Sequence, residues 1–358
     1  MPAGADADLT LRLAKHLLDL YSQAEADLLA AIARRVARGI DQPGWAEAKL
    51  AEITQLRAEA EARLAQLQAD LEPAVRQLIG DAHAAGAVQA DTDLAHIGIR
   101  TGFGHTNTAV VDTYVRQAVT NLEGTHLRIF RSVMDAYRDA VVEDVGQIAT
   151  GTATRRQVSQ RVLDRLADQG ITGFVDRAGR NWQLDTYAEM TARTAAGRAQ
   201  VQGALDRYQA AGKDLVIVSD APQECPVCRE FEGKVLSISG RTTGDAGNGM
   251  TVYGTVASAT AAGLFHASCR HRLGLYVPGL TRPMHGTADP EGDANRQQQR
   301  YLERGVRRWK RRELAALDDQ AAAAARARTR QWQGRLRDHV DTHDLKRLRY
   351  REVVGSAH

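Results

Sequence analysis

The three cysteines of this 358-residue chain lie in two short stretches that also contain two histidines. The first stretch, CPVC, runs from Cys225 to Cys228. The second, HASCRH, runs from His266 to His271 and contains Cys269. Thiolates and imidazoles clustered in this way could form a redox pair, a catalytic nucleophile, a disulfide or a metal site.

The spacing C-x2-C, then 37 residues, then H-x2-C-x-H favours one tetrahedral zinc ion. Cys225, Cys228 and Cys269 supply three ligands. Either His266 or His271 supplies the fourth, and His266 is slightly favoured because its gap to Cys269 mirrors the first motif. The alternative is that these side chains are buried thiols and hydrogen-bonded histidines without a metal. We predict one structural zinc ion per chain.

The other chemistries are less consistent with the sequence. An odd number of cysteines argues against a disulfide framework. A thioredoxin-like motif needs a βαβ context, which the sequence around CPVC lacks. The sequence also has neither the H-x-E of a zinc deaminase nor the H-E-x-x-H of a zinc protease. A nucleophile built from Cys269 and a histidine remains an alternative. So does a metal-dependent nuclease or a delivered toxin that uses Glu224, Glu230 or Glu232 as a general base. Because at least four ligands are available to close the site, we expect no enzymatic activity.

The elements that position these motifs are mostly helical. No proline occurs between Ala74 and Ala221, a span rich in good helix formers. Apolar spacing predicts a helix over 9–38. A seam from Leu50 to Leu78 near the 3.5-residue period predicts a coiled-coil-like hairpin, with a bend at Pro73. That seam fits packing within its own chain as well as pairing with another subunit.

Further along the chain, residues 105–148 read as one or two amphipathic helices. Thr154 and Gln157 form a capping box for a short helix that Gly170 closes, and another helix spans about 184–211. Short β-type runs follow: DLVIVSD, GKVLSI, TVYGTV and HRLGLYV.

These patterns predict an α+β fold that is mainly α. We divide it into a helical hairpin arm (1–80), a helical domain (81–212), a small β-rich Cys/His module stapled by zinc (213–280), a linker (281–295) and a basic helical tail (296–358). A small module with few large apolar side chains benefits from a metal.

The net charge of +3 is unevenly distributed. Between Arg296 and Arg351 there are 17 Lys and Arg against seven Asp and Glu. A helical turn of 100° per residue places five arginines on one outward face, opposite Leu302, Val306 and Trp309. They are Arg300, Arg304, Arg307, Arg308 and Arg311. Because guanidinium groups fit phosphate, this face predicts sequence-independent binding of double-stranded DNA. The alternatives are a solvated basic helix and an acidic protein surface.

The sequence also limits the other classes of protein to which the chain could belong. No apolar run is long enough to span a membrane, and the acidic N-terminus lacks the pattern of a signal peptide. We therefore expect a protein made and kept in a reducing compartment, with no membrane partner. No phosphate-binding glycine loop or dinucleotide fingerprint is present in the sequence, and we expect no small-molecule substrate.

Three stretches together resemble a known family. They are NWQLDTYAEMTARTA, then SDAPQECPVCREFEGKVLSI with FHASCRHRLGLYVPG, and finally QQRYLERGVRRWKRRE. The combination is similar to the tailed-phage family called phage minor capsid protein 2, a relative of the Mu-F-type head morphogenesis proteins. The resemblance covers roughly residues 90–350.

The resemblance implies a minor structural protein of the bacteriophage head, located in the head interior or at the portal vertex and assembled in the host cytoplasm. Its implied partners are the portal protein and other head or scaffold proteins, and its implied roles are head assembly, DNA packaging or ejection. By resemblance, the cysteines and histidines above fall on the family's Cys–His motif, and Tyr187, Arg193 and Thr194 fall on its helical signature. Mu-F relatives end the second motif in C-R-C where this chain has C-R-H, which leaves the role of His271 open.

Overall fold

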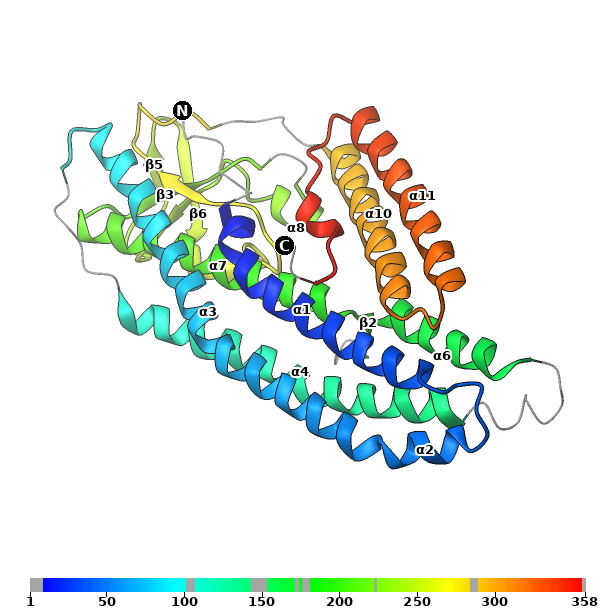
Figure 1. Ribbon diagram of the computed structural model, residues 1–358. Coiled ribbons are helices and arrows are strands. Elements are labelled where there is room, and N and C mark those ends of the chain that lie inside the picture. The colour runs from blue at the N-terminus through cyan, green and yellow to red at the C-terminus, as the bar shows by residue number, and fades with distance from the viewer. Residues whose placement is uncertain are drawn as a thin grey trace. The chain divides into compact units, whose positions relative to one another are not determined.

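The computed structural model describes residues 9–100, 107–142, 153–170, 174–175, 181–221, 224–283 and 289–355. Within these ranges the chain is mainly helical and carries a small mixed β-sheet (Figure 1). The prediction of a mainly helical α+β fold is therefore confirmed. Among the described residues, every helix is too short or too polar to cross a lipid bilayer.

The N-terminal helices are α1 (Leu9–Ala37), α2 (Trp45–Ala51), α3 (Ile53–Ala95) and α4 (Thr108–Val142). The predicted boundaries of α1 agree with the structure to within one residue. α3 extends well beyond the predicted hairpin arm and continues through Pro73. A proline removes one backbone hydrogen bond, and the good helix formers around it keep this helix unbroken. Coiled-coil pairing of α3 stays a prediction.

Local sequence signals explain the next helices. α6 (Arg155–Gln169) begins at Thr154, whose hydroxyl accepts from the Gln157 backbone while the Gln157 side chain returns to the Thr154 backbone. This is the predicted capping box, and Gly170 ends the helix as expected. α7 (Leu184–Ala210) also matches its predicted range.

Five strands form one sheet in the order β5-β6-β4-β3-β7. They are β3 (Leu215–Val218), β4 (Val235–Ser237), β5 (Asp245–Gly247), β6 (Met250–Thr255) and β7 (Leu273–Leu275). The β4–β6 pair is parallel, whereas β3–β4, β3–β7 and β5–β6 are antiparallel. Each predicted β-type run contains a strand. β5 escaped prediction because its three residues, Asp-Ala-Gly, have low β-propensity.

The remaining elements are short or lie near the C-terminus. β1 (Phe174–Val175) pairs with β2 (Asn181–Trp182) in a separate antiparallel ladder. α8 (Pro226–Arg229) follows β3 in the chain, and α9 (Val256–Ala261) follows β6. α10 (Pro290–Leu314), α11 (Asp319–Thr342) and the 3-10 helix η1 (Arg349–Glu352) complete the chain.

The chain divides into two compact units, each assembled from three separate segments. The first contains Met1–Leu17, Glu72–Thr120 and Glu189–Asn295, and the second contains Leu18–Leu71, Asn121–Ala188 and Arg296–His358. Four long helices, α1, α3, α4 and α7, each contribute residues to both units. The division into consecutive domains made from the sequence stays a prediction.

In the first unit, α3 and α7 pack on one face of the sheet. Ala90 and Leu94 of α3 share a core with Tyr208 of α7 and with strand residues such as Val216 and Leu275. The two helices approach closely through glycines. A Cβ at Gly86 would lie 1.8 Å from the Gln200 carbonyl oxygen, and one at Gly203 would lie 2.0 Å from the His83 carbonyl oxygen. No larger residue fits there without separating the helices.

The core of the second unit contains charged side chains as well as apolar ones. Leu302 and Val306 of α10 pack against Leu336 and Val340 of α11. Arg311 of α10, in the same unit, is fully buried.

Buried ion pairs compensate for the arginine charges. The Arg311 guanidinium lies 3.6 Å from both Glu25 of α1 and Asp185 of α7, and its Nε donates to the Ala167 carbonyl at 2.8 Å. Arg307 Nε lies 2.6 Å from the same Asp185 carboxylate. A buried charge is tolerated only when it is paired, so these carboxylates are needed to keep α10 in place.

We predict that Asp185→Asn destabilises the protein at pH 7 by about 3–5 kcal/mol, because it leaves two buried guanidinium groups without their shared carboxylate. Burial raises the pKa of Asp185, but Arg307 and Arg311 lower it, and the net direction is downward. The stabilisation that the ionised Asp185 gives the folded state is therefore present above the unfolded carboxyl pKa of about 3.9 and is lost as pH falls below it. Urea denaturation at several pH values measures this effect. Asp139→Asn, at an exposed position of α4 in the same unit, should change stability by less than about 0.5 kcal/mol.

Candidate metal centre

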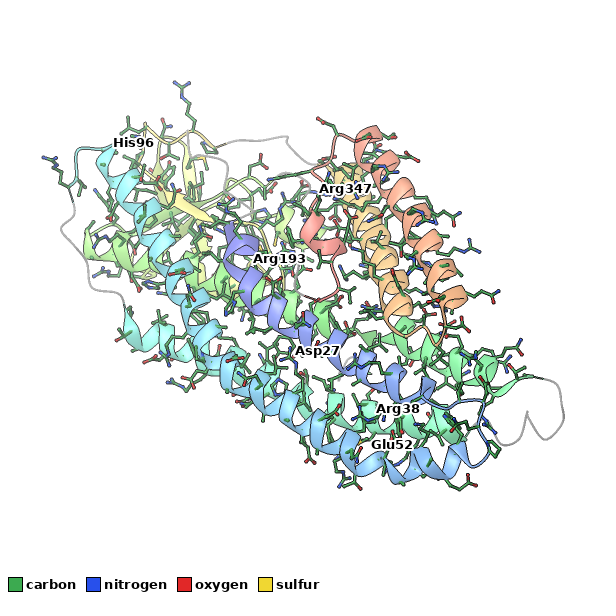
Figure 2. All side chains as sticks on the ribbon, viewed as in Figure 1. Asp27, Arg38, Glu52, His96, Arg193 and Arg347 are labelled. Carbon is green, nitrogen blue, oxygen red and sulfur yellow. The ribbon has the colours of Figure 1, made fainter. Side chains whose placement is uncertain are left out.

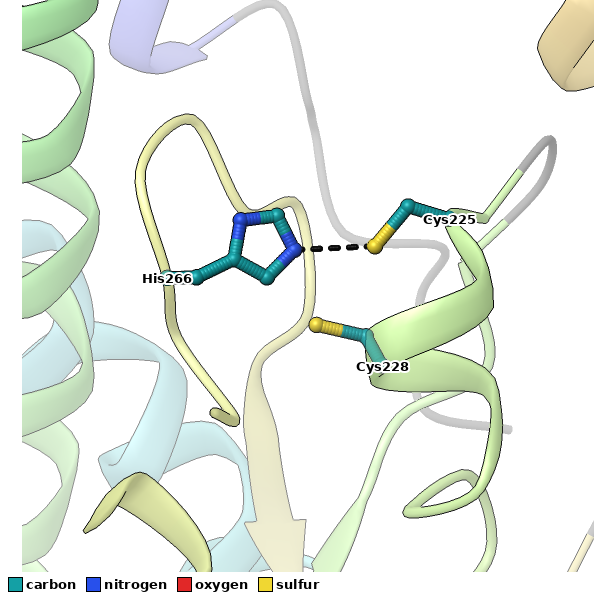
Figure 3. Close-up of side chains that lie close together, drawn as sticks. All are labelled: Cys225, Cys228 and His266. Carbon is teal, nitrogen blue, oxygen red and sulfur yellow. Dashed lines mark hydrogen bonds between the residues drawn. The ribbon is translucent and has the colours of Figure 1, made fainter. Parts of the chain in front are cut away.

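The two Cys/His motifs, distant in sequence, come together in the first unit. Sγ of Cys225, Sγ of Cys228 and one ring nitrogen of His266 lie within 4.8 Å of one another, and the donor atoms of Cys228, Cys269 and His271 do the same. The buried Cys228 thiol belongs to both groups. Figure 3 shows Cys225 at the start of α8 and Cys228 within it, with the His266 ring facing Cys225. All five predicted ligands thus lie in one cluster that could hold a metal ion.

The two motifs have matching backbone turns. The Cys228 amide donates to the Cys225 carbonyl at 3.2 Å, and the Cys269 amide donates to the His266 carbonyl at 3.0 Å. Each turn brings the first and fourth side chains of its motif to the same side. Pro226 follows Cys225 at the first helical position of α8, where a missing amide hydrogen has no cost.

Side-chain contacts within the cluster are short. Cys225 Sγ lies 2.8 Å from His266 Nε2, and Cys228 Sγ lies 3.5 Å from Cys269 Sγ. The other ring nitrogen of His266 contacts the Ala267 carbonyl at 2.9 Å. Because a backbone carbonyl can only accept, Nδ1 is the donor in this contact, and Nε2 is the ring nitrogen directed at the cluster.

His271 lies on the other side of Cys269. Its Nδ1 is 3.5 Å from Cys269 Sγ, and its Nε2 is 2.7 Å from a carboxylate oxygen of Glu232. The same Glu232 oxygen accepts from the Ala221 amide at 3.1 Å. His271 is only 2 % exposed. Sequence reasoning considered Glu232 as a general base, whereas the structure shows it engaged in holding a histidine ring.

These contacts shift the pKa values of Cys228, Cys269 and His271. Contact with Cys228 lowers the pKa of Cys269 and outweighs the effect of burial, and His271 lowers it further. The hydrogen bond to Cys269, together with burial, raises the pKa of Cys228. Burial lowers the pKa of His271, but its contacts with Cys269 and Glu232 raise it, and the net direction is upward. A site with three sulfur donors suits a soft or borderline cation such as zinc.

The signature helix α7 holds the second motif in position. Thr194 Oγ1 accepts from the Ser268 amide at 3.0 Å, and Ser268 has a left-handed φ of 61°. Gln200 accepts from the half-buried Arg272 at 2.6 Å, and Arg272 in turn donates to the His271 carbonyl at 2.9 Å. This positioning role of Thr194 was not visible in the sequence, because nothing local linked it to Ser268.

Arg193, labelled in Figure 2, is buried on the same helix. Its guanidinium lies 3.6 Å from Glu189, one helical turn earlier. Arg193 therefore forms an ion pair with a carboxylate of its own helix, α7. Tyr187, the third signature residue, belongs to the second unit and meets Trp182 edge to face, with ring centroids 5.7 Å apart.

The sequence left two catalytic alternatives, a cysteine nucleophile and a glutamate general base. Cys269, His271 and Glu232 follow one another like a nucleophile, its base and an orienting acid. However, the histidine is buried, and the sulfur of Cys269 also contacts Cys228, as in a cluster that could hold a metal ion. Of the other carboxylates, Glu224 is paired with Arg229 at 2.5 Å and Glu230 is exposed.

The basic face of α10 differs from the prediction. The expectation that its five arginines point outward is wrong for Arg307 and Arg311, which are buried. Arg308 is partly exposed and donates its Nε to Asp168 of α6 at 2.7 Å. Arg300 and Arg304 are half-buried. The physical reason is that acidic residues of α1, α6 and α7 meet this face, and helical periodicity carries no information about them. Binding of nucleic acid by these residues stays a prediction.

We predict that Cys228→Ser abolishes metal binding and lowers stability by several kcal/mol, because Cys228 is the donor common to both groups and structural metal binding contributes directly to folding. Elemental analysis and thermal unfolding of the purified protein under reducing conditions measure both effects. His339→Ala, at a position remote in sequence from the two motifs, should retain the metal. A wild-type protein without metal above background would contradict the assignment.

Comparisons with known proteins agree with the resemblance noted in the sequence. The chain is 26% identical to a structural protein of Lactococcus phage LL-H over 265 residues, which cover 68% of this chain and 70% of the relative. It is 35% identical to a structural protein of Lactococcus phage mv4 over 106 residues, 27% of this chain and 85% of the relative. No solved structure matches significantly. The profile of the family described as "Phage minor capsid protein 2" matches residues 6–341, nearly the whole chain, and the chain belongs to this family.

Proposed function

We propose that this protein is a minor structural component of the phage head, bound at the portal vertex, where it takes part in head assembly. The family match over residues 6–341 carries the proposal, and the phage structural proteins that it resembles support it. Portal association rests on the family resemblance. Roles in DNA packaging or ejection are extensions of the same proposal.

A structural zinc ion is the second part of the proposal. Cys225, Cys228 and Cys269 would hold it together with His266, since His266 and Cys269 form a turn that matches the Cys225–Cys228 turn. Bound zinc would tie α8 to the loop before β7 and so stabilise the small sheet. Four protein ligands close the coordination sphere, which supports a structural rather than catalytic role.

The experiment for the head assignment has two parts. Quantitative mass spectrometry of density-purified virions should detect the chain at a constant low copy number relative to the major capsid protein. Co-expression with the portal protein of the same phage should give co-elution on size exclusion. The surface variant Asp139→Asn should co-elute like the wild type. Absence from purified virions would contradict the head assignment, whereas presence without portal co-elution would contradict only the portal contact.

The basic tail is proposed to contact double-stranded DNA, and the exposed arginines of α11 support this more than those of α10. Between Arg326 and Arg337 the helix contains five arginines and no acidic residue. All five are exposed: Arg326, Arg328, Arg330, Arg335 and Arg337. Arg326, Arg330 and Arg337 share one flank at helical spacings of four and seven, so their guanidinium groups can meet successive phosphates.

We predict a log–log salt slope of about −2.7 for binding to a random-sequence duplex, the value for about three phosphate contacts. Replacing Arg326, Arg330 and Arg337 with Gln should abolish most of this slope without unfolding the protein. Fluorescence anisotropy at several salt concentrations measures it. A matched control replaces Arg116 and Arg131, exposed on α4, and should leave the slope unchanged. Equal weak binding by the wild type and the α11 variant would assign this face to a protein partner instead.

A further inference from the structure

The metal cluster contains five donors for four coordination positions, and the surroundings of the two histidines differ. His266 belongs to a turn that reproduces the Cys225–Cys228 turn, and its Nε2 is directed at the cluster. His271 lies beyond that turn, just before β7, and its ring bridges Cys269 and Glu232. The question is what the fifth donor does when the other four hold the metal.

The bridging geometry is that of a hydrogen-bond donor. A separation of 3.5 Å between Nδ1 and Sγ suits an N–H···S hydrogen bond, and 2.7 Å between Nε2 and a carboxylate oxygen suits a charge-assisted one. The acceptor is itself fixed, because the Ala221 amide donates to the same Glu232 oxygen. The chain Ala221–Glu232–His271 therefore orients the imidazole from a rigid backbone group.

The net charge expected at the zinc site also favours a hydrogen-bond donor at His271. Three thiolates and one neutral imidazole around a divalent zinc ion leave a net charge of −1 on a partly buried site. Hydrogen bonds donated to the sulfurs stabilise such charge. Arg272, which is half-buried and donates to the His271 carbonyl, places a guanidinium charge on this side of the cluster.

On this basis we propose that Glu232 and His271 act as a positioning pair outside the coordination sphere, in which His271 donates a hydrogen bond to the Cys269 thiolate and Glu232 fixes the ring. The inference rests on the proposed zinc site, in which His266 rather than His271 is the fourth ligand. The pair would hold Cys269 at the metal and reduce the charge on its sulfur.

The test uses the full-length protein reconstituted with Co²⁺ or Zn²⁺ under reducing conditions. His271→Asn is the informative variant, because the Asn amide can still donate toward Sγ but is a poor metal ligand beside thiolates. His271→Ala and His266→Ala remove each ring completely. Glu232→Gln weakens the orienting contact, and Glu230→Gln, at an exposed position two residues away, is its matched control.

We expect the wild type and His271→Asn to bind one metal per chain with the absorption bands of tetrahedral Co²⁺, and His266→Ala to lose those bands. Glu232→Gln should weaken zinc affinity by roughly 10-fold or more, as expected for a group that orients a ligand, and Glu230→Gln should leave it unchanged. The thiolate-to-cobalt charge-transfer band should shift in His271→Ala and return toward the wild-type position in His271→Asn. A purely structural role for His271 would not move this band.

Three outcomes overturn the proposal. If His271→Asn loses the metal as completely as His271→Ala while His266→Ala retains it, His271 is the ligand and the zinc site itself stands. If Glu232→Gln matches Glu230→Gln in affinity and band position, the carboxylate has no positioning role. If the wild type binds neither metal, the zinc site fails and the positioning pair fails with it.

Discussion

The arrangement of the first unit depends on bringing three thiols to one point. Cys228 is fully buried and lies among apolar side chains of the core that α3 and α7 form with the sheet. Thiols so close together cannot all ionise unless a cation compensates for them, because like charges at short range in a partly buried site strongly oppose ionisation. A metal at this point would relieve that conflict and fix α8 against the loop before β7.

The second unit shows how strongly tertiary context changes the meaning of a charged helix. α10 presents both apolar and arginine side chains to its surroundings, so that Val306 and Arg311 are both fully buried. Burying a guanidinium is tolerated because Glu25 and Asp185 approach it from other helices. Such networks seldom add much net stability compared with an apolar core, but removing one partner is costly. They therefore specify where α10 lies rather than how stable the fold is.

Helix α7 links the family signature to the Cys/His motifs. Its Thr194 accepts a backbone hydrogen bond from the second motif, and its Gln200 holds the arginine that follows His271. Neither contact involves a side chain of the candidate metal cluster. The Thr194 position of the signature is therefore explained by its contact with the second motif. This is consistent with membership of a family of phage structural proteins.

What the sequence by itself determined is local. The capping box of Thr154 and Gln157, the end of α6 at Gly170 and the four main β-type runs depend on residues a few positions apart, so their physical signals lie within one short window. The Cys/His spacing also identified every member of the cluster, since only these residue types offer soft or borderline ligands. Tertiary structure alone decided which side chains share a carboxylate, a turn or a core. The pairing of His271 with Glu232 and of Arg311 with Glu25 joins residues on different elements, and helical or strand periodicity describes one element at a time.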